Sequence, residues 1–465
     1  MQLIFEKSVK GKCGFKVSSS GVEGYNKLPK KYLRQEEPNL PEVSELDCVR
    51  HFTNLSRMNF SVDTNFYPLG SCTMKYNPKF SEKVAVLEGF CNLHPMIPLV
   101  LGSEFTSGAF SVISETEKLL SEILGMKAFT LEPMAGAHGE LTGLMLIAAY
   151  HKHQGNRKKY VIVPNSSHGT NPASSTIAGY QTVVIPSNKN GCVDLEEYKK
   201  HINNETAAVM LTCPNTLGLF ETEIKEVTDL AHKNGALVYY DGANLNAILG
   251  IARPGDLGFD VVHVNLHKTF ATPHGGGGPG AGPVGVSEKL VDFLPGGKRS
   301  IGSVAPFYGN FGVILKAYAY ILMLGKEGLI DVAKMSVLNA NYIRVKLKDY
   351  YELPYERICM HECVFSASFQ LENGVHAIDI AKYLIDKGIH PPTVYFPLIV
   401  KESLMIEPTE TESKETLDKF IEVMIEIANL AKTNPQAIKD APLTTPISRL
   451  DETKAVKDLK LKYNC

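Results

Sequence analysis

Asp260-Val-Val-His-Val-Asn-Leu-His267-Lys268-Thr269 is an apolar run that ends in a lysine, and a glycine-rich stretch from His274 to Pro283 follows it. The run predicts a buried strand, so Lys268 should lie at the end of that strand. Burial disfavours the charged ammonium and leaves a neutral amine, which is a nucleophile able to form a Schiff base with an aldehyde. The pattern therefore indicates covalent chemistry at Lys268.

A second apolar run, Ala236-Leu-Val-Tyr-Tyr-Asp241, ends in an aspartate. Ligands bind beyond the carboxyl ends of parallel strands, so we expect Asp241 and Lys268 to share one site. The pair suits pyridoxal phosphate (PLP), because a lysine binds its aldehyde and a carboxylate keeps its ring nitrogen protonated. Ala243 is small enough for the ring to lie against the backbone. A helix-capping role is the alternative interpretation of Asp241.

Three further loops are candidates for the same site. Met134-Ala-Gly136-Ala137-His-Gly-Glu140 opens a helical pattern with small residues, which let backbone N–H groups approach a phosphate. An ordinary N-cap loop is the alternative.

The other two loops also follow apolar runs. His168 can lay its imidazole on the cofactor ring, and Thr170 can donate to phosphate or substrate. The amide of Asn215 and the hydroxyl of Thr216 suit the phenolic oxygen of the ring. A solvated or capping histidine and a simple turn are the respective alternatives.

Alternating apolar runs and helical patterns between about residues 110 and 290 predict an α/β domain with a mainly parallel sheet. We expect strands at 160–163, 182–185, 207–212, 236–240 and 261–264. We expect helices beginning near Glu140 and spanning 194–202 and 223–233, with Gly235 as a C-cap.

After residue 300 the sequence pattern changes to long helical segments with a single expected strand, and we expect a smaller α+β domain there. Its expected elements are helices at 311–326 and 329–350, a strand at 365–371, and helices at 378–386 and 417–431. We expect four parts, namely an N-terminal arm (1–110), a large PLP-binding domain (111–300), the smaller domain (301–431) and a tail (432–465).

Composition excludes several classes of function. A chain of 465 residues should hold at least two domains, and a net charge of -2 gives no electrostatic case for nucleic acid or membrane binding. Apolar runs are too short for a membrane span, and the basic N-terminal arm lacks the apolar core of a signal peptide. Nine scattered cysteines indicate free thiols and a reducing cytoplasm.

Two weaker motifs carry no function in our interpretation. Cys359-Met-His361-Glu-Cys363 lacks a second ligand pair with zinc spacing, so we expect a structural segment and no metal site. The glycine run 275–278 lacks the spacing and the strand-turn-helix context of a dinucleotide fingerprint.

Long motifs in this chain resemble the glycine cleavage system P-protein family, glycine dehydrogenase (decarboxylating). They lie at residues 63–78, 135–140, 168–172, 214–218 and 265–279. The resemblance covers most of the chain and is closest to the second subunit of the split, two-subunit form.

The resemblance implies an aspartate-aminotransferase-like, fold type I PLP enzyme, an oxidoreductase of glycine catabolism. It implies that glycine is decarboxylated with release of CO2 and that its aminomethyl group passes to the lipoyl arm of H-protein. It also implies a partner, subunit 1, with two copies of each subunit. The resemblance also implies roles for individual residues. Lys268 attaches the cofactor and transfers a proton, Asp241 binds the ring nitrogen, and His168 stacks on the ring. Gly136 and Ala137 bind the phosphate, His267 and Thr269 make additional contacts, and residues 71–74 line the substrate mouth.

Two rival interpretations remain. The first is another fold type I enzyme, either hydroxymethyltransferase-like or an amino-acid decarboxylase. The second is a non-catalytic partner subunit, against which the retention of both Asp241 and Lys268 argues.

Overall fold

The structure is a computed structural model that describes residues 2–16, 18, 21, 28–36, 38–275, 279–459 and 461. The chain divides into two compact units, Asn65–Leu443 and Met1–Thr64 with Thr444–Cys465. The expected four-part division stays a prediction. Of the glycine run 275–278, residues 276–278 lie outside the described residues.

The smaller unit is built from short elements. They are the 3-10 helices η1 (Ile4–Lys7) and η3 (Lys30–Tyr32) and the helices α1 (Glu45–Ser56) and α15 (Glu452–Lys457). The Ser44 hydroxyl caps α1 by accepting the N–H of Asp47, which is why the helix starts there.

The large sheet of the other unit has the strand order β1-β7-β6-β5-β4-β2-β3. Its strands are β1 (Ala128–Thr130), β2 (Tyr160–Pro164), β3 (Gln181–Ile185), β4 (Thr206–Thr212), β5 (Leu237–Gly242), β6 (Val261–Val264) and β7 (Val284–Val286). Strands β3, β2, β4, β5 and β6 are parallel neighbours, while β7 is antiparallel to both β6 and β1. The expected mainly parallel sheet is confirmed.

Both faces of this sheet are buried, which explains the continuous apolar runs. In β4, Val209 and Leu211 join a core that also contains residues of α5 (Ser107–Leu124), α9 (Ile224–Lys233) and α10 (Phe311–Leu347). The intervening Ala208 and Met210 join a second core with residues of α6 (Gly136–His153). Helices therefore cover the sheet on both sides, as parallel sheets require.

The helices of this region are α5 (Ser107–Leu124), α6 (Gly136–His153), α7 (Thr170–Ile177), α8 (Leu195–His201) and α9 (Ile224–Lys233). The expected helices at 194–202 and 223–233 are α8 and α9, and the helix expected near Glu140 begins four residues earlier, at Gly136. The Asp194 carboxylate caps α8 by accepting two backbone N–H groups. Gly235 has φ +68° and follows Asn234, the C-cap of α9, so glycine ends this helix.

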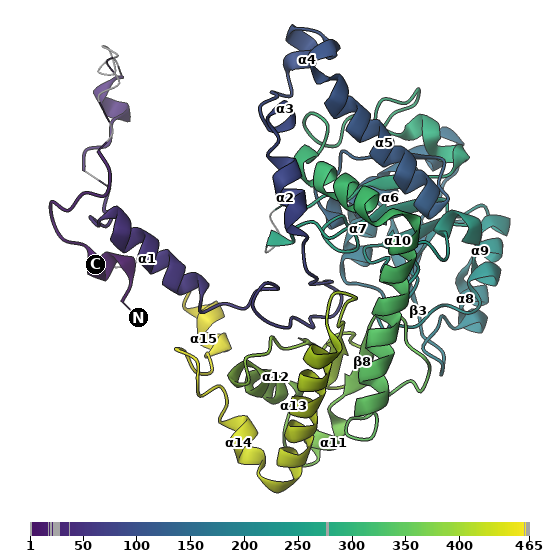
Figure 1. The fold of residues 1–465 in the computed structure, drawn as a ribbon. Helices are drawn as coiled ribbons and strands as arrows, with labels where there is room; N and C mark the ends of the chain where they lie inside the picture. Colours follow the sequence, from purple (N-terminus) through teal and green to yellow (C-terminus); the bar gives the residue numbers. More distant parts are fainter. Residues whose placement is uncertain are drawn as a thin grey trace. The chain divides into compact units, whose positions relative to one another are not determined.

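Helix α10 (Phe311–Leu347) is long and links the two sheets of this unit (Figure 1). Its first half contacts α2 (Lys79–Ala85) through Lys316 and Glu82. Its second half contacts α13 (Lys414–Thr433) through Tyr342 and Asp418. Gly325 interrupts it with φ +60° and ψ -170°, at the break expected between two helices.

The small sheet is antiparallel, with the order β8-β10-β9. It comprises β8 (Cys363–Ser366), β9 (Thr393–Val394) and β10 (Ser403–Ile406), with helices α11 (Ser368–Leu371), α12 (Ala377–Asp386), α13 (Lys414–Thr433) and α14 (Pro435–Lys439) around it. The expected strand at 365–371 is wrong beyond Ser366. The Ser366 hydroxyl accepts the N–H of Ser368, which turns the chain into α11.

Residues 65–106 precede these layers in the same unit. They contain the short helices α2 (Lys79–Ala85), α3 (Glu88–Cys91), α4 (Ile97–Val100) and η4 (Ser103–Thr106). Leu69 forms an antiparallel bridge with Ile406 of β10, so this segment is attached to the small sheet. Among the described residues, no helix is long and apolar enough to cross a membrane.

Candidate active site

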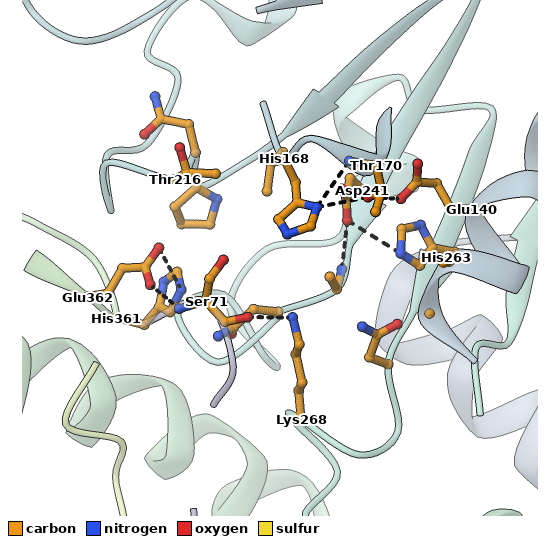
Figure 2. A pocket seen from close by; sticks show the side chains of 18 of the residues that line it. Ser71, Glu140, His168, Thr170, Thr216, Asp241, His263, Lys268, His361 and Glu362 are labelled. Atoms are coloured by element: carbon orange, nitrogen blue, oxygen red, sulfur yellow. Dashed lines mark hydrogen bonds and ion pairs between the residues drawn. The ribbon is translucent and has the colours of Figure 1, made fainter. Parts of the chain in front are cut away.

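A cavity of about 240 Å³ lies at the carboxyl ends of the central parallel strands. Of the expected site residues, the structure brings together Lys268, Asp241, Ala243, His168, Thr170, Gly136, Ala137, Asn215 and His267. Figure 2 shows His168, Asp241 and Glu140 on one side of this cavity, and Ser71, His361 and Glu362 on the other. The cavity is therefore a single site made from loops that follow different strands.

Lys268 lies in the loop after β6 and is half-buried. Its Nζ donates a hydrogen bond to the backbone carbonyl of Ser71, at 2.6 Å. A backbone carbonyl can accept a hydrogen bond from either form of the lysine amine. This contact therefore holds the Lys268 side chain in place within the cavity.

Asp241 is almost completely buried, at 4% exposure. Its carboxylate accepts from Asn171 Nδ2 (2.9 Å) and from the N–H of Ala243 (3.1 Å). Burial alone would raise the pKa of the Asp241 carboxyl, but His263 and the hydrogen bond from Asn171 lower it below its usual value. Asp241 is thus an ionised carboxylate facing the cavity, which is what a protonated ring nitrogen requires.

His263 and Tyr239 stand behind this aspartate. His263 Nδ1 lies 2.9 Å from the Tyr239 hydroxyl, and burial lowers the pKa of the His263 imidazole. Sequence reasoning missed His263, although a histidine inside the apolar run Val261–Val264 was a usable signal.

Glu140 is a second residue that the sequence analysis left without a role. It is 3% exposed, and its Oε2 accepts from Thr170 Oγ1 at 2.8 Å. Burial and the neighbouring Asp241 raise the pKa of Glu140 to about 7. Thr170 also lies 2.8 Å from His168 Nδ1, so it connects Glu140 to the imidazole proposed to stack on the ring.

The start of α6 provides the phosphate end of the cavity. Gly136 and Ala137 are its first residues, and the preceding Ala135 has no side chain that could cap their N–H groups. A Cβ at Gly136 would come within 2.5 Å of the Asn265 amide, so glycine is needed for this close approach. The N–H groups at this helix start and its positive end fit a phosphate.

Several polar atoms around the cavity are buried without a hydrogen-bond partner in the part of the chain that the structure describes. They are Glu140 Oε1, Thr212 Oγ1, Asn265 Oδ1, His267 Nδ1 and His361 Nδ1. Burial and the charge of Lys268 lower the pKa of His267 to about 4, so its imidazole is neutral. Buried polar atoms normally find partners, so these residues fit a polar cofactor such as PLP.

Two expected site residues use polar side-chain atoms within the protein. Thr269 is not among the described residues that line the cavity, and its Oγ1 accepts the N–H of Leu245 at 2.8 Å. Asn215 lines the cavity, and its Nδ2 donates to the Gly191 carbonyl and to Glu221. Its Oδ1 accepts from the N–H groups of Leu217 and Leu219, so Asn215 shapes the turn, and its contact with the ring oxygen stays a prediction.

His361 and Glu362 form the opposite wall. The segment Cys359–Cys363 was expected to be structural only, yet the side chains of His361 and Glu362 line the cavity. Glu362 Oε2 accepts the N–H of Ser71 at 3.0 Å, and burial together with Glu407 raises the pKa of Glu362 well above its usual value. Burial and Lys268 lower the pKa of His361 to about 3, so its imidazole is neutral.

This combination defines a class of protein. A mainly parallel sheet with helices on both faces, a lysine after one strand, an ionised aspartate at the end of the next and a helix start for phosphate are the features of fold type I PLP-dependent enzymes. Comparisons with known proteins narrow the class further.

Residues 332–444 match a model described as glycine dehydrogenase, C-terminal domain, and residues 137–299 match aminotransferase class-V. A protein of Caldanaerobacter subterraneus, named probable glycine dehydrogenase (decarboxylating) subunit 2, is 55% identical over 99% of this chain and 98% of its own length. A Thermotoga maritima protein of the same name is 54% identical over 98% of each chain. This chain belongs to the glycine dehydrogenase (decarboxylating) subunit 2 family.

Solved structures show the same fold. The inhibitor-bound glycine decarboxylase (P-protein) of the glycine cleavage system superposes with a TM-score of 0.70 at 20% identity, covering 86% of this chain and 93% of that one. A NifS-like protein superposes with a TM-score of 0.63 at 16% identity, over 79% of this chain and all of that one. The fold type I architecture expected from the sequence is confirmed.

Proposed function

We propose that this chain is the PLP-binding subunit of a two-subunit glycine dehydrogenase (decarboxylating). It removes the carboxyl group of glycine as CO2 and passes the aminomethyl group to the lipoyl arm of H-protein. The observation that supports this most is that the buried Asp241 and the half-buried Lys268 line one cavity, in a chain that is 55% identical to a relative of that name. Bound PLP supplies the electron sink that decarboxylation needs.

The residues of the cavity divide the work between binding and proton control. Asp241 would hold a proton on the ring nitrogen of bound PLP, and His168 would lie against the ring. Gly136, Ala137 and Asn265 would hold its phosphate. Lys268 would bind the aldehyde end, and its Nζ, beside the Ser71 carbonyl, would hold or move a proton.

The partners follow from the same proposal. The relatives are named subunit 2, which supports a complex with subunit 1, and we propose two copies of each. Lipoylated H-protein is the acceptor of the aminomethyl group. We place the complex in the cytoplasm, because the eight described cysteines are free thiols, and thiols persist in a reducing compartment.

Exchange of labelled bicarbonate into the carboxyl group of glycine tests the reaction. The mixture contains this chain loaded with PLP, subunit 1 and lipoylated H-protein, and the control replaces the chain by its Lys268→Ala variant. We expect label in glycine only with the unaltered chain. A hydroxymethyltransferase-like enzyme or a silent scaffold would incorporate no label although all components are folded.

A further inference from the structure

The segment from Gly70 to Asn77 forms several hydrogen bonds with the loop that contains Lys268 (residues 268–272). Lys268 Nζ donates to the Ser71 carbonyl (2.6 Å), and Lys75 Nζ donates to the Thr269 carbonyl (2.7 Å). Asn77 Nδ2 donates to the carbonyls of Ala271 (3.0 Å) and Thr272 (3.3 Å). We call residues 70–77 the strap; it fixes both the amine of Lys268 and the backbone that follows it.

The strap has an unusual backbone. Ser71 has φ +67° and Thr73 has φ +49°, in the left-handed region that side-chain-bearing residues rarely adopt. Such conformations persist only where surrounding contacts impose them, and they concentrate at functional sites. The contacts that impose them here should therefore matter for the position of Lys268.

Two buried carboxylates make those contacts. Glu362 accepts the N–H of Ser71 at 3.0 Å. Glu407 accepts the N–H of Thr73 at 3.1 Å and the Thr73 hydroxyl at 2.7 Å. Asn244 Nδ2, from the loop after Asp241, also donates to Glu407, at 2.6 Å. Each left-handed residue of the strap is thus anchored through its own N–H.

The small sheet explains why both carboxylates lie at this point. Cys363 of β8 pairs with Ile406 of β10 in antiparallel register. Glu362 precedes Cys363 and Glu407 follows Ile406, so the two residues are opposite each other at the same end of the sheet. They are 2% and 0% exposed, and the strap crosses this end, where Leu69 bridges Ile406.

A metal site is a poor explanation of this cluster. His361, Glu362 and Glu407 offer ligand atoms within 4.8 Å of one another. However, the carboxylate oxygens accept hydrogen bonds from Ser71, Thr73 and Asn244. A cation would compete with these donors for the same lone pairs.

We propose that Glu362 and Glu407 are positioning residues of Lys268. They fix the strap so that the Ser71 carbonyl holds the lysine amine where it can reach the cofactor aldehyde. The inference rests on the proposed function for the identity of the cofactor and for nothing else. It predicts that the carboxylates control how fast Lys268 joins PLP, while the rest of the cofactor site stays intact.

The test compares two binding reactions of the apoenzyme complex with subunit 1. PLP binds and then condenses with the amine, with loss of water, and borohydride makes the bond permanent. Pyridoxine 5′-phosphate has no aldehyde, so it reports on the site without the lysine. Glu362→Met removes the oxygen that accepts the Ser71 N–H, and Glu407→Gln replaces one of the two oxygens that accept from Thr73 and Asn244. We expect both substitutions to slow lysine attachment at least tenfold and to change the affinity for pyridoxine 5′-phosphate less than twofold.

Two further comparisons keep the test sharp. Glu402→Gln is the matched control, because Glu402 precedes β10 at its other end and accepts the N–H of Ala377. Thr73→Val removes one contact to Glu407, and Thr73→Ser keeps it; we expect slow attachment in the first and wild-type attachment in the second. These two variants decide the matter if Glu407→Gln does not fold.

Wild-type attachment rates in Glu407→Gln, Glu362→Met and Thr73→Val would overturn the proposal. Equal losses of PLP attachment and pyridoxine 5′-phosphate binding would also overturn it, because they would show a general structural role. Neither readout uses glycine, so a failure of the proposed reaction in the bicarbonate assay is a separate result.

Discussion

His263 and Asp241 face each other on adjacent parallel strands, and His263 Nε2 lies 3.4 Å from Asp241 Oδ1. The contact helps to keep Asp241 ionised in a buried position. Asp241 can hold a proton on a ring nitrogen only if its own carboxylate remains charged. The register of β5 and β6, which places His263 beside Asp241, therefore contributes directly to the chemistry of the site.

The charge of Asp241 is testable by Asp241→Asn. The amide keeps the size of the side chain but cannot hold the ring nitrogen protonated, so PLP should still bind. We expect the bicarbonate exchange rate to fall at least about 100-fold, which corresponds to about 2.7 kcal/mol in the activation barrier, because a neutral ring withdraws electrons poorly. Cofactor absorbance measures binding in parallel, and an exchange rate near that of the unaltered chain would remove the proposed role.

Glu140 should make the stability of the apoenzyme depend on pH. Its pKa is about 7 when folded, against 4.5 as the ordinary value, so between these values the folded chain keeps a proton that the unfolded chain has lost. Stability from this group therefore falls as pH rises from 4.5 to 7. We expect the Glu140→Gln variant to lack this fall. Its free energy of unfolding relative to wild type should therefore increase by about 1–3 kcal/mol between pH 5 and pH 8. Denaturant titrations of both proteins at the two pH values measure this increase, and a difference in stability that does not change with pH would contradict the prediction.

Lys75 and Glu410 form a buried ion pair at 2.6 Å, with Lys75 side-chain exposure of 1%. Lys75→Met would leave Glu410 without its main partner. We expect a loss of about 3–5 kcal/mol in the free energy of unfolding, as for other buried pairs that lose one member. Lys414→Met is the comparison, because its exposed pair with Asp418 should be worth less than about 1 kcal/mol. Equal effects of the two substitutions on the denaturation midpoint would argue against a buried charge pair.

Gly136→Ala tests the phosphate end of the cavity. The new Cβ would lie 2.5 Å from the Asn265 amide, so Asn265 or the start of α6 must move. We expect the affinity for pyridoxine 5′-phosphate to fall about tenfold, or about 1.4 kcal/mol, measured by calorimetry. Gly312→Ala, where a Cβ meets nothing within 4 Å, should bind normally. Unchanged affinity in the Gly136→Ala variant would show that the phosphate does not bind at the start of α6.

The central strands were predictable because both of their faces are buried, which leaves continuous apolar runs in the sequence. Strands β1 and β7 have three residues each, too few for a periodic signal. The expected strand at 365–371 went wrong at Ser366, where a side-chain hydrogen bond outweighed the β-forming residues.

The site was predictable where a residue type has to stand at a strand end, as Lys268 and Asp241 do. It was not predictable where long-range contacts set the geometry. Nothing in the sequence near Glu362 or Glu407 shows that strand pairing brings them together under the strap. For Asn215, the sequence did not show that its amide also donates to Gly191 and Glu221.

Thr73 and Glu407 are 334 residues apart in the sequence, yet they join in one hydrogen-bonded cluster beside Lys268. A chain emerging from the ribosome presents the strap early and its second anchor only near the end of synthesis. We therefore expect an unfinished chain to build the central sheet without orienting the amine. Attachment of the cofactor would then mark a chain that has been completed and folded, and a truncation before Glu407 should yield a protein that holds PLP loosely or not at all.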